Sequence, residues 1–218
     1  MSSVVLLFSG GLDSTVALTY YLKLGWDVTA LTFRYPSKHN NAEQKAAMRI
    51  VAYYWDRGIK FNQLRWEAVK VPKKLFEGAE SSLLTGTTGG TSMIVPGRNL
   101  LFIAMANVIA VSRGIPGVAI ATNLSDPADF PDCTPDFLNS ADGAMGAGYG
   151  TTLLFPFGSW AKYEIVKRGA QLGAPMQYSW SCYKEGPIPC GACPACKLRS
   201  KAFAFAGEVD DALHIKEV

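Results

Sequence analysis

The feature that most constrains this chain is the run Ser9–Ser14 (S-G-G-L-D-S), which directly follows an apolar segment. Val4–Phe8 is apolar throughout, as expected of a strand buried on both faces of a sheet. Helical spacing of apolar residues then extends from Ser14 to Leu24. A strand, a glycine loop and a helix in this order place free backbone N–H groups and the positive end of a helix at a sheet edge. The run is therefore predicted to bind an anion such as a phosphate group.

The residue types in this loop suit phosphate binding. Gly10 and Gly11 admit backbone conformations closed to other residues and allow a ligand to approach closely. The hydroxyls of Ser9 and Ser14 could donate to phosphate oxygens, and Asp13 could cap the helix, orient the loop or hold a cation. No Gly-Lys-Ser/Thr follows, so this is not a Walker A loop, and the alternative is a plain glycine turn. The residues expected to contact a nucleotide are Phe8, Ser9, Gly10, Gly11, Leu12, Asp13 and Ser14.

Short β-rich runs and longer helical stretches alternate through most of the chain, which predicts an open parallel, doubly wound α/β sheet. Residues 1–175 are expected to form this domain, and residues 176–218 a small segment packed on it. Residues 80–93, rich in Gly, Ser and Thr, are expected to form a surface loop. The expected strands are 4–8, 27–33, 59–65, 118–122 and 153–155, and the expected helices are 14–24, 41–55, 99–112, 135–145, 162–172 and 194–205.

Four of the five cysteines lie close together near the C-terminal end of the sequence. In a reducing compartment such a cluster indicates metal binding rather than disulfides. Four thiolates close the tetrahedral shell of Zn²⁺ and leave no place for water, so the metal is expected to be structural. An iron–sulfur cluster and free thiols are the alternatives. The four expected ligands are Cys182, Cys190, Cys193 and Cys196.

Composition excludes several classes of protein. With 49% hydrophobic and 18% charged residues the chain has material for a packed core, and its longest apolar stretches are too short to span a bilayer. The N-terminus lacks the features of a secretory signal, which favours a cytoplasmic protein. A net charge of +3 without a basic stripe argues against nucleic acid as a partner. Trp55, Trp66 and Trp160 could serve a homodimer, which we expect, or the core.

Further motifs narrow the interpretation. The Ser9–Ser14 run resembles the phosphate loop of the pyrophosphatase-loop ATP enzymes, whose fold is called adenine nucleotide alpha hydrolase-like. Val95–Asn99 (V-P-G-R-N), P-D-C at 131–133, K-Y-E-I at 162–165 and the cysteine-rich run from Ser179 to Arg199 follow in order. Together they resemble the 7-cyano-7-deazaguanine synthase family, over nearly the whole chain.

This resemblance implies an ATP-dependent carbon–nitrogen ligase. Its substrates would be 7-carboxy-7-deazaguanine, ammonia and ATP with Mg²⁺, and it would carry one zinc ion. ATP would adenylate the carboxylate, ammonia would give an amide, and a second activation would dehydrate the amide to the nitrile. The product is a precursor of queuosine and archaeosine.

The resemblance also suggests roles for single residues. Lys162 matches the family's K-x-E-I and could reach a phosphate, although a surface lysine is the alternative. Arg98 could grip a carboxylate or phosphate, or form a structural ion pair. His39 and Glu43 match an H-x-x-x-E motif and would share one helix face, where they could also be an ordinary surface pair. The expected catalytic set is Asp13, Lys162, Arg98, Asp132 and His39.

The aspartates after the fourth strand are candidates for binding the guanine-like edge, which offers N–H donors. Asp132 is preferred over Asp129, and Asp126 and Asp136 could instead form turns beside prolines. Asn99 could be a helix cap. Cys133 could be a nucleophile, but a packed thiol is more common.

The chain departs from the family in two expected substrate loops. It has Tyr35-Pro36-Ser37-Lys38-His39 where members have Tyr-Gly-Gln-Arg-His, and Thr134 stands where they have Arg after Pro-Asp-Cys. Three alternatives follow: a ligase that joins a deazaguanine acid to another amine, a tRNA-modifying enzyme with the same loop, and a non-catalytic zinc module.

Overall fold

The sheet forms the centre of the protein and has five parallel strands in the order β3-β2-β1-β4-β5. The computed structural model describes residues 2–35, 37, 39–76, 95, 97–124 and 130–213. It confirms the predicted open parallel sheet. The strands are β1 (Ser3–Leu7), β2 (Asp27–Arg34), β3 (Leu64–Lys70), β4 (Gly117–Ala119) and β5 (Thr152–Leu154).

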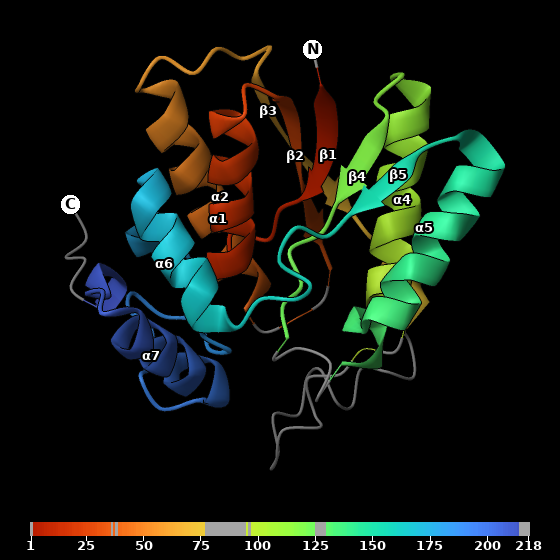
Figure 1. Ribbon diagram of the computed structural model, residues 1–218. Coiled ribbons are helices and arrows are strands. Elements are labelled where there is room, and N and C mark those ends of the chain that lie inside the picture. Colours follow the sequence, from red (N-terminus) through yellow and green to blue (C-terminus); the bar gives the residue numbers. More distant parts are fainter. Residues whose placement is uncertain are drawn as a thin grey trace.

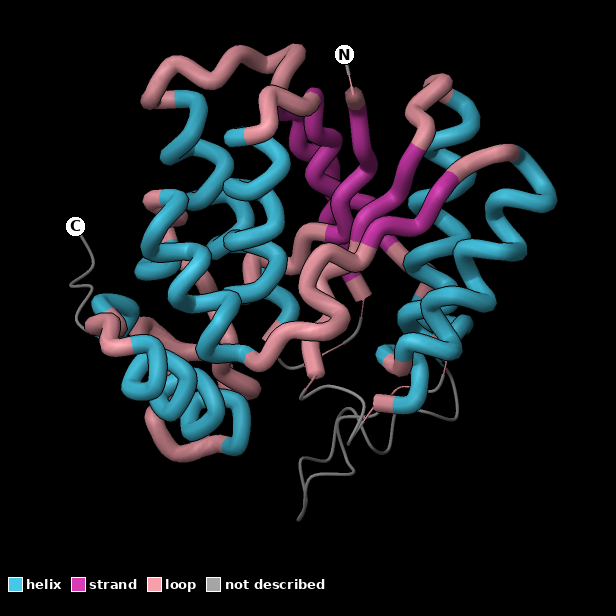
Figure 2. The backbone as a smooth tube through the Cα atoms, viewed as in Figure 1, coloured by secondary structure: helices cyan, strands magenta, loops and turns pink. Residues whose placement is uncertain are grey.

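Helices cover both faces of this sheet, as Figure 1 shows. One layer contains α1 (Leu12–Lys23), α2 (Asn40–Trp55) and α6 (Lys162–Leu172), and the other contains α4 (Arg98–Ser112) and α5 (Pro135–Tyr149). The C-terminal helix α7 (Pro194–Ala206) packs against α6. Strand order reverses at β1, which lies between β2 and β4, and the carboxyl ends of these strands meet at the lower end of the sheet in Figure 2. Open α/β sheets bind ligands at this kind of point.

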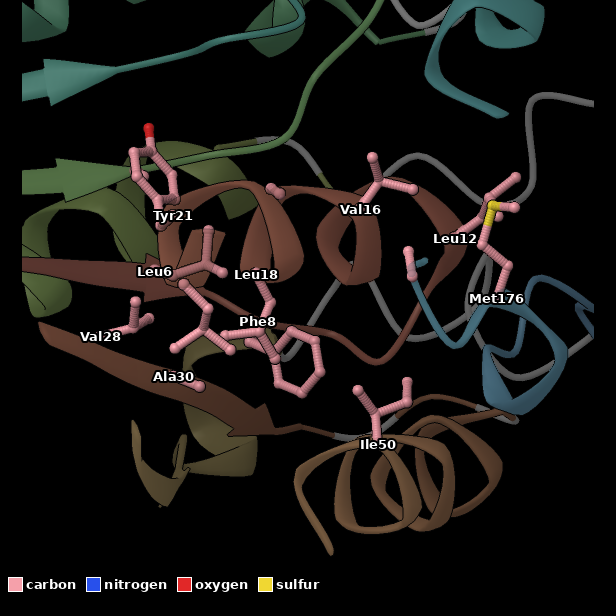
Figure 3. Packing of buried hydrophobic residues seen from close by; sticks show 14 of the residues in the cluster. Leu6, Phe8, Leu12, Val16, Leu18, Tyr21, Val28, Ala30, Ile50 and Met176 are labelled. Atoms are coloured by element: carbon pink, nitrogen blue, oxygen red, sulfur yellow. The ribbon is translucent and has the colours of Figure 1, made fainter. Parts of the chain in front are cut away.

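Two hydrophobic clusters, one on each face, hold the layers together. The first joins β1 and β2 to α1, α2 and α6, and it includes Ala202 and Phe203 of α7. Figure 3 shows Phe8, at the end of β1, facing Ile50 of α2. The alternation of apolar runs in the sequence therefore predicted the position of the core correctly, because a strand covered on both faces is apolar at every position.

One element lies elsewhere than predicted. A strand was expected at Ile59–Arg65, but residues 61–63 form a turn closed by Gln63 N–H donating to Lys60 O, and β3 spans Leu64–Lys70. β3 lies at the edge of the sheet and is only half covered. An edge strand tolerates polar residues such as Arg65 and Glu67, so apolarity was a poor guide. The loop expected at residues 80–93 lies outside the described residues.

Trp66 and Trp160 pack against the first hydrophobic cluster, and Trp55 is 39% exposed beside Phe61. The homodimer expected from these aromatics stays a prediction. Within the described ranges, no helix combines the length and the apolarity that a bilayer crossing requires.

A buried arginine ties α7 to the segment before the cysteines. Arg199 is 3% exposed and forms two hydrogen bonds of 2.6 and 2.9 Å with the Asp210 carboxylate. It also donates to Ser179 Oγ at 2.8 Å and to the Met176 carbonyl at 2.9 Å. A buried charge satisfied on all sides contributes to the position of every group that it contacts.

We expect Arg199→Met to lower the free energy of unfolding by about 3–5 kcal/mol, because Asp210 is left as an uncompensated buried charge. Urea unfolding followed by circular dichroism would measure this. The matched control is Arg113→Met, which breaks a bidentate pair with Glu67 whose side chains are about a third exposed, and we expect it to cost at most about 1 kcal/mol. Equal losses in the two variants would contradict the structural role of Arg199.

Candidate functional site

The glycine loop has a conformation that only glycine can adopt here. Gly10 has a φ of +78°, in the left-handed region. A Cβ at this position would lie 2.6 Å from both Ala47 N and the Glu43 carbonyl oxygen, so the loop contacts the backbone of α2 directly. The Gly10 carbonyl accepts a hydrogen bond of 2.9 Å from Trp180 N–H. The loop is thus fixed on one side by α2 and on the other by the segment that leads to the cysteines.

The loop's hydroxyls are arranged around the start of α1. Ser9 Oγ lies 3.2 Å from Ser14 Oγ and accepts a hydrogen bond from Gly11 N–H at 3.1 Å. Ser14 and Thr15 both donate to the Gly11 carbonyl, at 3.1 and 2.7 Å. Two serine hydroxyls, the first amides of α1 and the positive end of this 12-residue helix therefore meet at one point. This arrangement suits a phosphate group.

Asp13 connects three elements at this edge of the sheet. Its Oδ2 accepts a hydrogen bond of 2.8 Å from Lys162 Nζ at the start of α6, and another of 3.2 Å from Asn123 Nδ2 after β4. Asp13 Oδ1 is buried and has no hydrogen-bond partner among the described residues. The lysine and the aspartate predicted from separate motifs are therefore in direct contact, and one carboxylate oxygen is left available for a cation.

A cavity of about 370 Å³ opens beside the loop. Phe8, Ser9, Gly11, Leu12, Asp13 and Ser14 line it, whereas Gly10 does not, because its backbone faces α2. Lys162 lies in the same wall, and the end of β2 contributes Leu31, Thr32 and Phe33. The cavity is large enough to hold most of a nucleotide-sized ligand.

A second group of polar side chains lines this cavity from β2, α2 and α4. Arg98, the first residue of α4, donates to Tyr35 Oη at 3.4 Å. His39 Nε2 lies 3.7 Å from Glu43 Oε1. Burial raises the pKa of Glu43 to about 8, although Arg98 opposes this rise. Burial, with Arg98 adding to it, lowers the pKa of His39 to about 4 against the opposing effect of Glu185. His39 is therefore a neutral imidazole at neutral pH.

Burial alone would lower the pKa of Arg98, but the nearby Tyr35, Glu43 and Asp132 outweigh it and raise this pKa. Arg98 thus remains a cation inside the cavity wall, as the prediction that it grips an anionic group requires.

Asp132 is placed differently from the other predicted residues. Its Oδ2 accepts a hydrogen bond of 2.9 Å from Asn99 N–H in the first turn of α4, and it does not line the cavity. Asn99 Nδ2 donates to the Asp132 carbonyl and to Cys133 Sγ, at 3.2 and 3.1 Å. Cys133, which is buried, does line the cavity. Asp126 and Asp129 lie outside the described residues, as do the substituted loop positions Pro36 and Lys38.

The four clustered cysteines converge on one point. The sulfur atoms of Cys182, Cys190, Cys193 and Cys196 all lie within 4.8 Å of one another, and Cys190 Sγ is 4.0 Å from Cys196 Sγ. A tetrahedral ion with Zn–S bonds of about 2.3 Å would separate its sulfurs by about 3.8 Å, so the donor set fits one zinc-sized ion. Backbone N–H groups of Ala192 and Cys193 lower the pKa of Cys190 to about 6, which favours the thiolate that a metal requires.

Two residues of the site had no role assigned from the sequence. Asn123, which holds Asp13, comes just after β4, and its only signal was a polar residue at the carboxyl end of a predicted strand. Trp180 is part of a recognised motif, but its contact with Gly10 depends on packing between segments 170 residues apart.

Comparisons with known proteins agree with this geometry. Residues 3–207 match the family described as Queuosine biosynthesis protein QueC. The chain is 34% identical over 224 residues to the 7-cyano-7-deazaguanine synthase of Synechococcus sp. (strain CC9311), covering 96% of each chain. It is 33% identical over 220 residues to the enzyme of that name from Thermoplasma acidophilum, covering 94% of this chain and 89% of the relative.

Among solved structures, a 4-thiouridine synthetase–RNA complex with bound ATP superposes with a TM-score of 0.51 at 20% identity. The likeness covers 94% of this chain and 50% of that one, and it supports the fold only. The sequence relatives go further: since the family match spans nearly the whole chain and includes the glycine loop, Lys162 and the four cysteines, this protein belongs to the QueC family.

Proposed function

We propose that this chain is an ATP-dependent ligase that converts 7-carboxy-7-deazaguanine and ammonia to 7-cyano-7-deazaguanine. The relatives named as 7-cyano-7-deazaguanine synthases support this product. The observation that carries the ATP-dependent step is the cavity wall in which the Ser9–Ser14 loop, the first amides of α1 and the Asp13–Lys162 pair meet.

In the first half-reaction, a carboxylate oxygen of the acid attacks the α-phosphorus of ATP, and pyrophosphate leaves. The loop would hold the departing pyrophosphate with backbone amides and with the hydroxyls of Ser9 and Ser14. Lys162 would neutralise charge on the same phosphates. Ammonia then attacks the adenylated carbonyl and releases AMP to give the amide. In the second activation the amide oxygen is adenylated, and loss of AMP leaves the nitrile.

Two metals belong to this proposal. Asp13, with its unpartnered buried Oδ1, would hold Mg²⁺ beside the phosphates, where the ion supplies charge neutralisation. The four cysteines would hold one structural Zn²⁺, which supplies stability rather than chemistry because its shell is closed. Their close sulfur–sulfur spacing favours a single ion over an iron–sulfur cluster, whose several irons would keep the thiolates further apart.

The decisive test is product identification. Purified protein supplied with 7-carboxy-7-deazaguanine, ATP, Mg²⁺ and ¹⁵N-ammonium should form a ¹⁵N-amide and then a ¹⁵N-nitrile, with release of AMP and pyrophosphate. Mass spectrometry that detects neither product while ATP is bound would reject this substrate. Incorporation of a different amine under the same conditions would favour the alternative of a related ligase.

We expect Lys162→Met to lower acid-dependent exchange of pyrophosphate into ATP by roughly 100- to 1,000-fold, because it removes a cation from the developing phosphate charge. The exchange assay reports adenylation without any contribution from ammonia. Lys167→Met, on the exposed side of the same helix, is the matched control and should retain full exchange. Similar losses in both variants would show that the helix, not the charge at Lys162, matters.

A further inference from the structure

Two carboxylates line the described part of the cavity, and only one of them is engaged in the phosphate machinery. Asp13 Oδ2 is bound by Lys162 and Asn123. The carboxylate of Glu43 receives no hydrogen bond from any described residue. It lies 3.7 Å from His39 Nε2, which is too long for a direct hydrogen bond. Glu43 is therefore an acid in the cavity wall with unused acceptor capacity.

His39 adds a second acceptor to the same place. The residue is 7% exposed and lines the cavity, and its Nδ1 is buried without a hydrogen-bond partner among the described residues. A neutral imidazole has one nitrogen that accepts. The other groups that act on this pair are the Arg98 guanidinium, the Tyr35 hydroxyl and the Glu185 carboxylate. In its ionised form Glu43, beside a neutral imidazole, suits a ligand rich in N–H donors.

The pair lies beside the place where the acid would be activated. The Glu43 backbone contacts Gly10, so the first turn of α2 adjoins the phosphate loop. His39 and Glu43 also line the same cavity as the phosphate loop, so an acid activated on that loop would share the cavity with this pair. The nucleophile that displaces AMP has to approach through the same region. Its protonated form, ammonium, is a small cation with four N–H donors.

We propose that His39 and Glu43 form an amine subsite that binds ammonium, and that the Glu43 carboxylate takes its proton before attack on the adenylated acid; this rests on the proposed function. Transfer of the proton gives ammonia and a neutral Glu43. The nitrogen lone pair forms the C–N bond, the C–O bond to AMP breaks, and the second proton shed by the new amide nitrogen passes to water. Burial raises the pKa of Glu43 to about 8, so the free acid is mostly protonated at neutral pH. A bound ammonium ion favours the carboxylate form, as a neighbouring cation does, and the high proton affinity of that carboxylate then favours the transfer.

The test compares two nucleophiles in Glu43→Gln. Hydroxylamine is mostly uncharged at neutral pH, so it needs no base to become reactive, whereas ammonium does. We expect ammonia-dependent amide formation to fall at least about 100-fold, the usual contribution of a general base. Hydroxamate formation from hydroxylamine and acid-dependent pyrophosphate exchange should both stay within a few-fold of wild type. Glu43→Asp, which keeps the acid, should recover part of the ammonia reaction.

Controls separate the possible outcomes. Glu67→Gln, which neutralises an acid on the far edge strand β3, should leave all three reactions unchanged. If Glu43→Gln lost the amide and hydroxamate reactions to the same extent, the proposal would be overturned. A raised KM for the deazaguanine acid together with reduced pyrophosphate exchange would also overturn it, because that result would place Glu43 on the deazaguanine ring. A wild-type protein without acid-dependent exchange would instead refute the proposed function itself. Thermal unfolding identifies any variant that misfolds. If a folded Glu43→Asp variant lost hydroxamate formation as fully as amide formation, Glu43 would not act as the general base.

Discussion

Replacing Gly10 with alanine is expected to abolish ATP-dependent activity and to destabilise the protein. Two costs add at this position. A φ of +78° costs a non-glycine residue about 1–2 kcal/mol. The new Cβ would also come within 2.6 Å of the backbone of α2, and crowding of this kind typically costs about 1–3 kcal/mol more. The loop can relieve the clash only by moving away from α2, which would displace the amides that we propose to bind pyrophosphate. Nucleotide binding by calorimetry and thermal unfolding measure the two effects.

Gly25→Ala is the matched control for this variant. Gly25 has a φ of +75°, but nothing lies within 4 Å of a Cβ built there. It should therefore show the conformational cost alone, a loss of about 1–2 kcal/mol, with nucleotide affinity unchanged. If Gly10→Ala bound ATP as tightly as Gly25→Ala does, the loop would not be the nucleotide site.

The parts of the fold that the sequence predicted are those where local pattern and burial agree. β1, β2 and the six longer helices lie within a few residues of their expected positions, because a strand covered on both faces and an amphipathic helix each leave a clear apolar period. β3 was misplaced because its sequence is that of a half-covered edge strand. The contact of Gly10 with α2 could not be predicted from the sequence either, because a glycine motif indicates an unusual φ but not which helix packs against it.

The site residues likewise fall into those that local sequence predicts and those that it does not. The cysteines and the phosphate loop could be predicted because their spacing in the sequence alone places the functional groups close together. Asn123 and Trp180 act through contacts across the fold, which no local pattern encodes. Asp132 is a different case. This acid lies at the predicted edge of the sheet and is bound to the start of α4, where unpaired amides attract carboxylates, and its role toward the guanine-like edge stays a prediction.

The four-cysteine segment and the phosphate loop are joined through Trp180. Trp180 donates its backbone N–H to Gly10 O and its indole N–H to the carbonyl of Cys182, each at 2.9 Å. Arg199 holds the same segment through Ser179 and Ser181. An ion that fixes Cys182 would thereby also support the loop, although it lies outside the chemistry.

Cys196→Ser is therefore expected to reduce both metal content and nucleotide affinity. Cys196 is buried in the first turn of α7, so its loss removes one of four ligands and leaves the other thiolates with no closed shell. Structural zinc contributes folding energy directly. We therefore expect a melting temperature lower by at least about 6 °C, from a loss of about 3 kcal/mol or more at roughly 2–4 °C per kcal/mol. Metal analysis by mass spectrometry should fall from one ion per chain to well below one.

Cys133→Ser is the control, because this buried thiol lies outside the cluster and receives a hydrogen bond from Asn99. It should keep a full complement of metal and a melting temperature close to that of the wild type, and its retained activity would also exclude a nucleophilic thiol. The coupling through Trp180 adds a stricter requirement. Chelation of the metal from the wild-type protein should weaken ATP binding before the sheet unfolds, since the loop loses one of its two supports while its contact with α2 remains. Loss of metal at unchanged ATP affinity would mean that α2 alone holds Gly10 in place.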